Sequence, residues 1–365
     1  MLVDFAVDKS TRPRSAAERE QLLADPGFGR VFTDHMITIG WSAEQGWHDA
    51  ALVPYGPLSM DPASQVLHYA QEIFEGAKAF RRPDGSIVMF RPHANAARFS
   101  QSARRMALPE LPAETFVRSL ELLVATERDW VPDAPGRSLY VRPFMYADGR
   151  TLMADKPPSS VRYLVIASPA APYFKGGVTP VTVWLPEHFT RAAPGGTGEA
   201  KCGGNYAAAL AGQLEALAAG CDQAVWLDAA EHRWVEEMGG MNLFFVFGSG
   251  SAARLVTPPL TGTLLPGITR DSLLTLAPDL GIPVQESMVS VSQWRDGAAS
   301  GELTEVFACG TAAVITPVGA VKSADEEWMI ADGKPGSVTM RLRAALTGIQ
   351  FGTAPDPYGW IHPIC

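Results

Sequence analysis

The chain is poor in the features that mark secreted and metal-binding proteins. Only four of its 365 residues are cysteine, and none of them forms a Cys-x-x-Cys pair. We therefore expect neither a disulfide framework nor a cysteine-rich zinc site. We expect reduced thiols in a cytoplasmic protein. No two histidines stand at metal-binding spacing, so we expect no bound metal.

Long apolar runs and blocks of basic charge are also missing. No stretch reaches the roughly 18 apolar residues that a membrane span needs, and the longest, Met241 to Phe247, has the length of a strand. The first residues lack the basic-then-apolar profile of a secretory signal. A net charge of −9 without a lysine- or arginine-rich block argues against nucleic acid or an acidic membrane as a partner.

What is present is an ordinary globular composition, 47% hydrophobic and 19% charged, on a chain long enough for two domains. A stretch rich in proline and glycine at 168–180 indicates a connection between them. We therefore predict a small N-terminal domain over 1–170, a linker over 171–180 and a larger C-terminal domain over 181–365.

Strand and helix patterns mix without the regular alternation of a doubly wound sheet, which favours an α+β fold. Strands are expected at 32–39, 47–55, 79–82, 87–90, 139–144, 162–167, 181–185, 224–227 and 242–247, with a strand pair within 305–317. Helices are expected at 64–72, 94–106, 115–130, 205–219 and 269–277. Residues 1 to about 30 look irregular.

The most informative single residue is Lys201, which stands between two glycine pairs and directly before a helical pattern with Leu210, Leu214 and Leu217. Glycine permits close approach of backbone to a ligand. This neighbourhood suits a lysine that must reach a bound molecule, such as a Schiff-base lysine. A flexible basic surface loop explains the same residues equally well.

Four further segments carry possible chemistry, each with a plainer alternative. Residues 236–242 place acidic residues before an apolar strand, either to bind a protonated ring nitrogen or as a solvated turn. Residues 265–272 open a helix at a Pro-Gly turn, a natural phosphate site or only a helix start. Residues 309–313 form an anion-binding turn or a simple β-turn. Arg98 forms a fork on phosphate or covers apolar surface.

Taken in order, these segments resemble one family. The motifs are Phe74-Glu75-Gly76, Phe90 to Arg98, Lys201 with Gly203-Gly204-Asn205-Tyr206, Glu237 with Gly239 to Asn242, Leu265-Pro266-Gly267 and Gly310-Thr311-Ala312. They resemble the class IV, fold-type IV aminotransferases, which use pyridoxal 5'-phosphate, and among them the longer branched-chain amino acid aminotransferases. The resemblance runs from about residue 28 to about 351. It implies a two-domain fold with a small N-terminal α/β domain and a larger, cofactor-binding C-terminal domain with a β-barrel-like core.

The resemblance assigns the cofactor site residue by residue. Lys201 is the catalytic lysine, which bonds to the cofactor and then moves a proton on the substrate. Glu237 keeps the ring nitrogen protonated, Tyr206 bonds the ring oxygen, and Arg98 clamps the phosphate. The implied cofactor-binding residues are Arg98, Lys201, Tyr206, Glu237, Gly240, Ile268, Thr269 and Thr311.

The substrate side follows from the same resemblance. The implied residues are Phe28, Tyr69, Phe74, Tyr140, Arg142, Tyr173, Thr311 and Ala312. Aromatic walls would bury a branched side chain, Arg142 would receive the distal carboxylate of glutamate, and Tyr69 would reach the neighbouring subunit's site. The implied reaction is ping-pong transamination of leucine, isoleucine or valine with 2-oxoglutarate, in a cytoplasmic homodimer that acts on amino acids and 2-oxo acids.

Departures from the family pattern lie on the substrate side. They are the loop 145–153, Ala77 in place of leucine, and Pro172 before Tyr173. They keep open a related class IV enzyme specialised for a β-methylated or aromatic amino acid. A D-amino acid aminotransferase or an aminodeoxychorismate lyase is a further alternative. A non-catalytic protein that only binds the cofactor would not need both Lys201 and Glu237.

Overall fold

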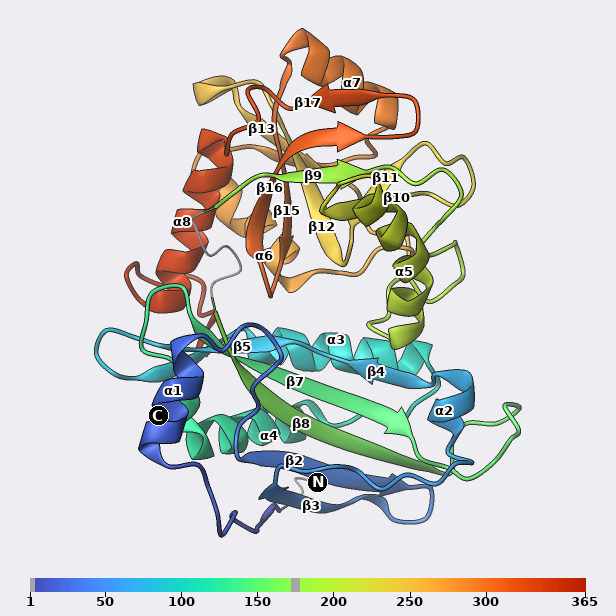
Figure 1. The fold of residues 1–365 in the computed structure, drawn as a ribbon, viewed down its shortest axis with the longest axis vertical. Coiled ribbons are helices and arrows are strands. Elements are labelled where there is room, and N and C mark those ends of the chain that lie inside the picture. Colours follow the sequence, from blue (N-terminus) through green and yellow to red (C-terminus); the bar gives the residue numbers. More distant parts are fainter. Residues whose placement is uncertain (1–3, 172–177) are drawn as a thin grey trace. The chain divides into compact units, whose positions relative to one another are not determined.

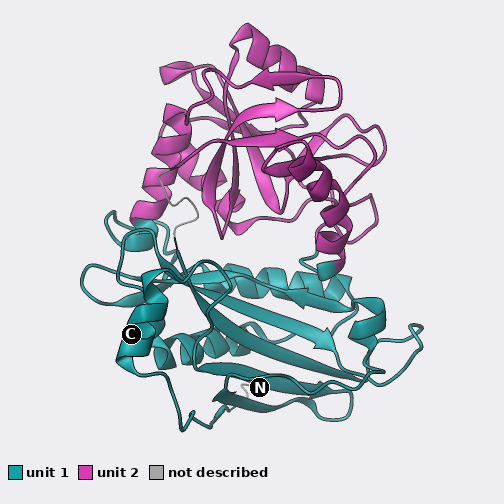
Figure 2. Cartoon of the chain, in the orientation of Figure 1, with its two compact units in different colours: residues 1–172, 200–203, 349–365 teal, residues 173–199, 204–348 magenta. Residues whose placement is uncertain are grey.

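The computed structural model describes residues 4–171 and 178–365, and its contacts divide the chain into two compact units (Figure 1, Figure 2). Unit 1 comprises residues 1–172, 200–203 and 349–365, and unit 2 comprises residues 173–199 and 204–348. Most of the predicted linker at 171–180, with Tyr173, lies outside the described residues.

Unit 1 is built on one mixed sheet of nine strands in the order β1-β3-β2-β8-β7-β5-β6-β18, with β4 paired to β7. The strands are β1 (Ala6–Val7), β2 (His35–Ser42), β3 (Gly46–Pro54), β4 (Glu72–Phe74), β5 (Ala77–Arg81), β6 (Ile87–Phe90), β7 (Ser138–Ala147), β8 (Ser160–Ala170) and β18 (Ile361–Pro363). Its helical segments are α1 (Ala16–Ala24), α2 (Gln65–Tyr69), α3 (Pro92–Arg105), α4 (Ala113–Thr126) and the 3-10 turn η1 (Arg128–Trp130).

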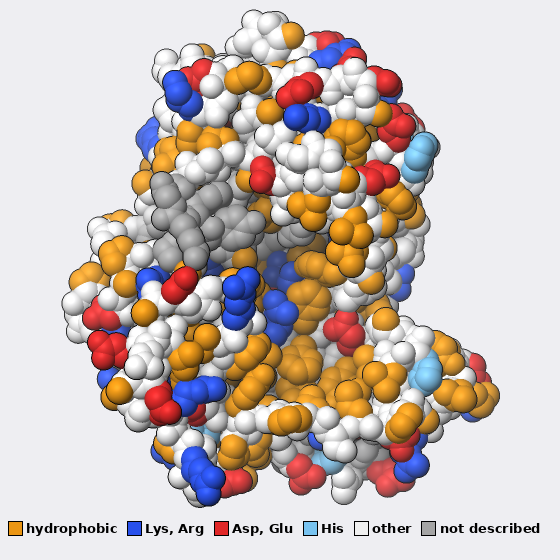
Figure 3. Space-filling view, viewed as in Figure 1, with side chains coloured by type: hydrophobic (Ala, Val, Ile, Leu, Met, Phe, Trp, Pro, Cys, Tyr) orange, Lys and Arg blue, Asp and Glu red, His pale blue; other side chains and the backbone are white. Residues whose placement is uncertain are grey.

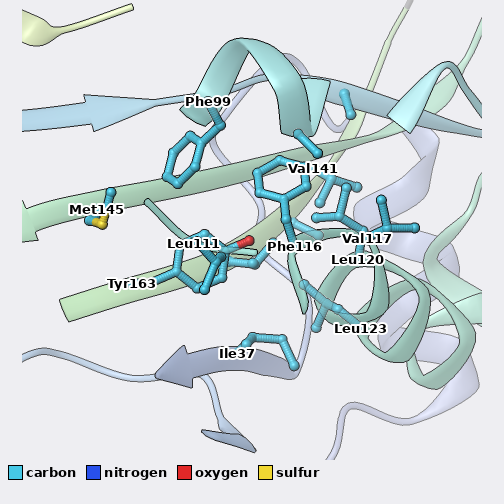
Figure 4. Close-up of a cluster of buried hydrophobic side chains, with 14 of the residues drawn as sticks. Ile37, Phe99, Leu111, Phe116, Val117, Leu120, Leu123, Val141, Met145 and Tyr163 are labelled. Atoms are coloured by element: carbon cyan, nitrogen blue, oxygen red, sulfur yellow. The ribbon is translucent and has the colours of Figure 1, made fainter. Parts of the chain in front are cut away.

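The core of unit 1 lies where α3 and α4 pack on the sheet (Figure 4). The rings of Phe99, Phe116 and Tyr163 meet there, with Phe99 5.2 Å from Phe116 and 5.6 Å from Tyr163 between centroids. The Tyr163 hydroxyl is not left bare, because it shares a hydrogen bond of 2.9 Å with the hydroxyl of Ser119. Burial raises the pKa of Tyr163. This rigid layer gives α3 a fixed position above the strands.

Unit 2 contains a closed β-barrel. Its sheet runs β11-β10-β9-β16-β15-β12, and β12 pairs back to β11, so six strands close on themselves. Closure leaves those strands without free edges. The strands are β9 (Val181–Trp184), β10 (Gln223–Leu227), β11 (Val235–Met238), β12 (Met241–Phe247), β13 (Arg254–Thr257), β14 (Val284–Glu286), β15 (Leu303–Gly310), β16 (Val314–Lys322) and β17 (Glu327–Met329).

The remaining helices are α5 (Gly203–Ala218), the 3-10 turn η2 (Gly250–Ala252), α6 (Ile268–Asp279), α7 (Val291–Ser300) and α8 (Ser337–Phe351). Two acidic oxygens of Glu305, on β15, accept the backbone N–H groups of Val338 and Thr339 at 2.9 and 2.7 Å. A carboxylate at this end of α8 satisfies donors that a helix cannot satisfy internally. It ties the helix to the barrel.

The predicted α+β fold with a barrel-like core is confirmed. The helices expected at 94–106, 115–130, 205–219 and 269–277 are α3, α4 with η1, α5 and α6. The prediction of an irregular N-terminal segment was wrong, because α1 begins at a capping box in which Ser15 and Glu18 exchange hydrogen bonds. None of the residues of α1 is buried, so the helix has no apolar stripe that a periodicity analysis could detect.

The two units do not follow one cut in the sequence. Residues 200–203 and 349–365 belong with unit 1, whereas we expected all of 181–365 in a C-terminal domain. The reason is packing: Cys202 is buried in the core of unit 1, Phe351 meets Phe80 at 5.0 Å between ring centroids, and β18 pairs with β6. Across the described ranges, the helices are all too short or too polar to traverse a bilayer.

Candidate active site

Three hydrogen bonds clamp the backbone around Lys201 to unit 1. The Lys201 N–H donates to the hydroxyl of Ser102 on α3 at 2.9 Å, and the Lys201 carbonyl accepts the Phe74 N–H at 2.9 Å. The N–H of Gly203 donates to the carboxylate of Glu72. A side chain at Gly203 would place its Cβ 2.1 Å from that carboxylate oxygen, so Glu72 would have to move and give up this position. Gly203 therefore packs closely on Glu72, and hydrogen bonds fix the backbone on both sides of the Lys201 side chain.

The Lys201 side chain extends along the ring of Phe74, with its ammonium nitrogen 4.9 Å from the ring centroid. An aromatic face attracts an ammonium group without holding it as firmly as an ion pair does. The backbone is thus fixed, and the amine lies against an aromatic ring. That combination suits a lysine that must act on a bound molecule.

Arg98, the predicted phosphate clamp, lies buried on α3 and forms a two-pronged ion pair with Glu75. Its Nε and Nη2 atoms donate to the two carboxylate oxygens at 2.7 and 2.9 Å. Burial acts to raise the pKa of Glu75, but the charge and hydrogen bonds of Arg98, with a contribution from Lys201, hold it below its ordinary value. The alternative of a surface arginine covering apolar residues is excluded.

The predicted substrate residues of unit 1 form one aromatic group around Arg142. Its guanidinium carbon lies 4.7 Å from the ring centroid of Phe74 and 5.3 Å from that of Tyr140, and its Nη2 donates to the Tyr140 hydroxyl at 3.1 Å. Phe28 meets Tyr140 edge to face at 5.0 Å. The Nε atom of Arg142 is buried and has no hydrogen-bond partner within the described ranges. The structure therefore brings Phe28, Phe74, Tyr140 and Arg142 together.

Tyr69 lies apart from this group in its contacts. It ends α2, and its hydroxyl donates to the carbonyl of Leu152 at 2.6 Å. It therefore holds the loop after β7, the segment whose sequence departs from the family pattern. Tyr173, the remaining predicted wall residue, lies outside the described residues.

In unit 2, Glu237 is a buried carboxylate at the centre of a polar cluster. It forms an ion pair of 2.9 Å with the Nε of Arg191, and its other oxygen accepts the Leu265 N–H at 2.8 Å. Asn242 donates to the same oxygen at 3.2 Å. Glu236 and Glu237 are only 7% and 2% exposed. The alternative of a solvated acidic turn is thereby excluded.

Arg191 is the residue that sequence analysis missed. Besides Glu237, its guanidinium binds the carbonyls of Thr263 at 2.6 Å and Gly198 at 3.2 Å. Arg191 thus connects the Glu237 carboxylate to the loops that contain Gly198 and Thr263. The sequence around Arg191 does not indicate this role. Two of its partners, Glu237 and Thr263, lie 46 or more positions away, and only Gly198 is near it in sequence.

The other predicted cofactor residues of unit 2 lie at turns around this cluster. Gly267 precedes α6, which has no side-chain cap, so Ile268 and Thr269 present the first backbone N–H groups of the helix. A Cβ at Gly267 would lie 2.0 Å from the side-chain oxygen of Asn242, and one at Gly240 would lie 3.3 Å from the ring of Tyr206. Both glycines therefore let the backbone approach closely. Thr311 and Ala312 form the turn between β15 and β16.

The four cysteines are free thiols, of which Cys202, Cys221 and Cys309 are buried. Burial raises the pKa of the Cys309 thiol, which keeps it protonated. Over 4–171 and 178–365, no cluster of three or more histidine, cysteine or acidic side chains is arranged to hold a metal ion.

Comparison with known proteins agrees with this geometry. The profile of the class IV aminotransferases matches residues 72–321. A branched-chain-amino-acid aminotransferase of Mycolicibacterium smegmatis is 60% identical over 98% of both chains, and one of Mycobacterium tuberculosis is 57% identical over 98% of both.

Solved structures extend the match to the fold. The branched-chain amino acid aminotransferase of Escherichia coli superposes with a TM-score of 0.71 at 28% identity, covering 91% of this chain and 99% of the other. The T.th. enzyme, solved with pyridoxamine 5'-phosphate, gives a TM-score of 0.72 at 28% identity, covering 90% and 98%. The chain belongs to the class IV aminotransferase family, among the branched-chain-amino-acid aminotransferases.

Proposed function

We propose that this chain transfers the amino group of leucine, isoleucine or valine to 2-oxoglutarate, with pyridoxal 5'-phosphate as cofactor. The observation that carries the proposal is the clamped Lys201 beside Phe74, together with relatives that bear this activity in their names. When bound, pyridoxal phosphate supplies an electron-withdrawing ring that makes the α proton of an amino acid acidic.

The residues present fit this cofactor. A protonated ring nitrogen needs a buried carboxylate as its partner, and Glu237 is a buried carboxylate paired with Arg191 and the Leu265 N–H. A phosphate needs hydrogen-bond donors, and each unit offers some: the Arg98 guanidinium in unit 1, and in unit 2 the start of α6, which has no side-chain cap. Glycine at 240 and 267 lets the backbone lie close to the side chains of Tyr206 and Asn242.

The reacting residue is Lys201. Its amine would take the α proton from the amino acid and give a proton to the C4′ carbon of the cofactor, acting as general base and then as general acid. Since the hydrogen bonds to Ser102 and from Phe74 fix the backbone of Lys201, the amine moves by rotation of its own side chain. The proton transfer therefore needs no rearrangement of the chain.

Two kinds of substrate must use one pocket in turn. The rings of Phe28, Phe74 and Tyr140 offer apolar surface to a branched aliphatic side chain. Arg142 lies against the same rings with a buried Nε atom, so it can pair with the distal carboxylate of glutamate. We infer that Arg142 binds the substrate in the glutamate half-reaction, whereas the aromatic rings bind it in the branched-chain half-reaction.

We also propose that the protein is a homodimer that pairs through α5. Leu210, Leu214 and Leu217 are 58, 58 and 56% exposed, and the neighbouring residues Ala207, Ala211 and Ala218 are exposed too. In Figure 3, hydrophobic side chains are visible along the surface that α5 occupies in Figure 1. The opposite face packs Gly212 on Trp226.

A stripe of this kind is the unpaired half of a helix–helix contact. Leucines at i, i+4 and i+7 with alanines between them form knobs and holes on one surface, so the stripe complements a second copy of itself. An exposed apolar stripe also disfavours a monomer in water. A cytoplasmic location is part of the same proposal, and four free thiols support it.

The decisive experiment compares the purified chain with its Lys201→Ala variant. We expect the native protein to bind pyridoxal phosphate with visible absorbance, and to convert leucine, isoleucine and valine with 2-oxoglutarate. The variant should lose turnover by at least about a thousandfold and lose the visible band. The panel should also contain phenylalanine, a β-methylated amino acid and D-alanine.

The panel distinguishes the proposal from its alternatives. A clear preference for the β-methylated or aromatic substrate would replace the branched-chain assignment while keeping the aminotransferase. Turnover of D-alanine without L-leucine would contradict the stereochemistry, and a native protein that binds no pyridoxal phosphate would end the proposal altogether.

A further inference from the structure

Glu75 is a fully buried carboxylate to which the reaction assigns no role. It lies between β4 and β5, and both of its oxygens are occupied. Arg98 donates to them through Nε at 2.7 Å and Nη2 at 2.9 Å, Asn95 donates at 2.7 Å, and the Gly76 N–H donates at 3.1 Å. The charge of Lys201 also acts on this carboxylate.

The ion pair with Glu75 orients the guanidinium of Arg98. A guanidinium presents two forked edges, and Glu75 occupies the edge formed by Nε and Nη2. The guanidinium also has an outer edge, formed by Nη1 and Nη2, and an arginine can bind a phosphate in a fork through such an edge. The direction of that edge is set by Glu75, and Asn95, one turn earlier on α3, holds Glu75 in place.

A purely structural role does not account for this arrangement. A buried ion pair adds little net stability, because the cost of desolvating the two charges offsets most of their attraction. Well-placed polar contacts around an ion are instead typical of groups that must be held ready for a ligand. Here Glu75 holds Arg98 at two of its nitrogens, Nε and Nη2, before any ligand arrives.

We propose that Glu75 is a positioning residue for pyridoxal phosphate, which acts by aiming the outer edge of Arg98 at the phosphate. The inference rests on the proposed function, because it needs a phosphate-bearing cofactor. It predicts an effect on the phosphate group alone. The aldehyde and ring of the cofactor do not depend on the direction of Arg98.

The test measures binding with and without the phosphate. The full chain is freed of cofactor, and dissociation constants for pyridoxal phosphate and pyridoxal are measured by quenching of tryptophan fluorescence. Glu75→Gln should weaken pyridoxal phosphate binding by about tenfold or more and change pyridoxal binding by less than about twofold. Arg98→Met should show the same split, and the double variant should bind no more weakly than Arg98→Met alone.

A matched control comes from the same helix. Arg104 of α3 pairs with Glu110 on the surface at 2.5 Å, so Glu110→Gln removes a carboxylate from an arginine of α3 without touching the site. It should bind both ligands as the native chain does. Thermal unfolding of each variant verifies that it is folded.

If Glu75→Gln does not fold, Asn95→Ala decides, since it loosens Glu75 but keeps both charges. A selective loss of about threefold for pyridoxal phosphate supports the proposal, and unchanged affinity overturns it. Equal losses for both ligands in Glu75→Gln, or a full additional loss in the double variant, also overturn it. A native chain that does not prefer pyridoxal phosphate over pyridoxal contradicts the proposed function itself.

Discussion

The backbone N–H of Lys201 donates a hydrogen bond to the hydroxyl of Ser102, 2.9 Å away on α3. Ser102 is fully buried, and its helix also carries Arg98. One helix therefore holds the backbone of the reacting lysine and the side chain expected to bind the phosphate. The spacing between the two is set by a rigid element, as precise catalysis requires.

Ser102→Ala should damage catalysis more than its size suggests. It leaves the Lys201 N–H without its acceptor, a loss of about 1–3 kcal/mol for a buried donor, and it lets the lysine backbone drift. We expect lower stability to urea and a fall in kcat of about tenfold. Ser100→Ala, at a partly exposed position of the same helix, is the control. Native kcat in Ser102→Ala would show that the clamp does not serve catalysis.

Arg142→Ala should separate the two half-reactions. The variant keeps the rings of Phe74 and Tyr140 for a branched side chain, but it removes the cation that we expect to receive a distal carboxylate. Single-turnover rates should fall about a hundredfold for glutamate and about threefold or less for leucine. Equal losses with the two amino acids would contradict the carboxylate role.

The candidate cofactor residues could be proposed from the sequence because each belongs to a short local motif. Glycine around Lys201, acid before an apolar strand and a Pro-Gly helix start are all readable within a dozen positions. The ion pairs that fix these residues could not. Arg191 meets Glu237, and Glu75 meets Arg98, across folded segments, and single-sequence reasoning has no access to such distances.

Hydrophobic periodicity also gave only local information: it located the apolar face of a helix but not its packing partner. The spacing of Leu210, Leu214 and Leu217 correctly indicated one face of α5, but it did not say what covers that face, and within the chain the three side chains remain exposed. The reverse holds for α1, whose capping box is visible at Ser15 and Glu18 but whose surface position leaves no apolar period. A hydrophobic period marks a helix face only where that face carries apolar residues.

Leu214→Glu should break the dimer that we propose. A charge at the middle of the α5 stripe cannot be buried against a second copy without a partner. Sedimentation velocity should show the monomer at micromolar concentrations where the native chain is a dimer. Leu260→Glu is the control, because Leu260 is 46% exposed but lies outside α5. A native chain that is already monomeric would refute the interface.

Glu236→Gln should change the pH dependence of stability. Burial raises the pKa of Glu236, and its contacts with Thr263 and Arg191 lower it by less. One of its oxygens has no hydrogen-bond partner within the described ranges. A carboxyl with a raised pKa holds its proton more tightly in the folded state. Its contribution to stability is therefore complete below the ordinary pKa of glutamic acid and is lost as the pH rises through the raised value.

The variant removes that titration. Between pH 5 and pH 8 the free energy of unfolding of Glu236→Gln should change less than that of the native chain, and near pH 8 the variant should be more stable by on the order of 1 kcal/mol. Urea unfolding across this range measures both effects. Glu231→Gln, on the exposed turn before β11, should leave the native pH profile unchanged. If Glu236→Gln instead steepens the loss of stability with rising pH, the carboxylate is stabilised as an anion and the assigned direction of its pKa is wrong.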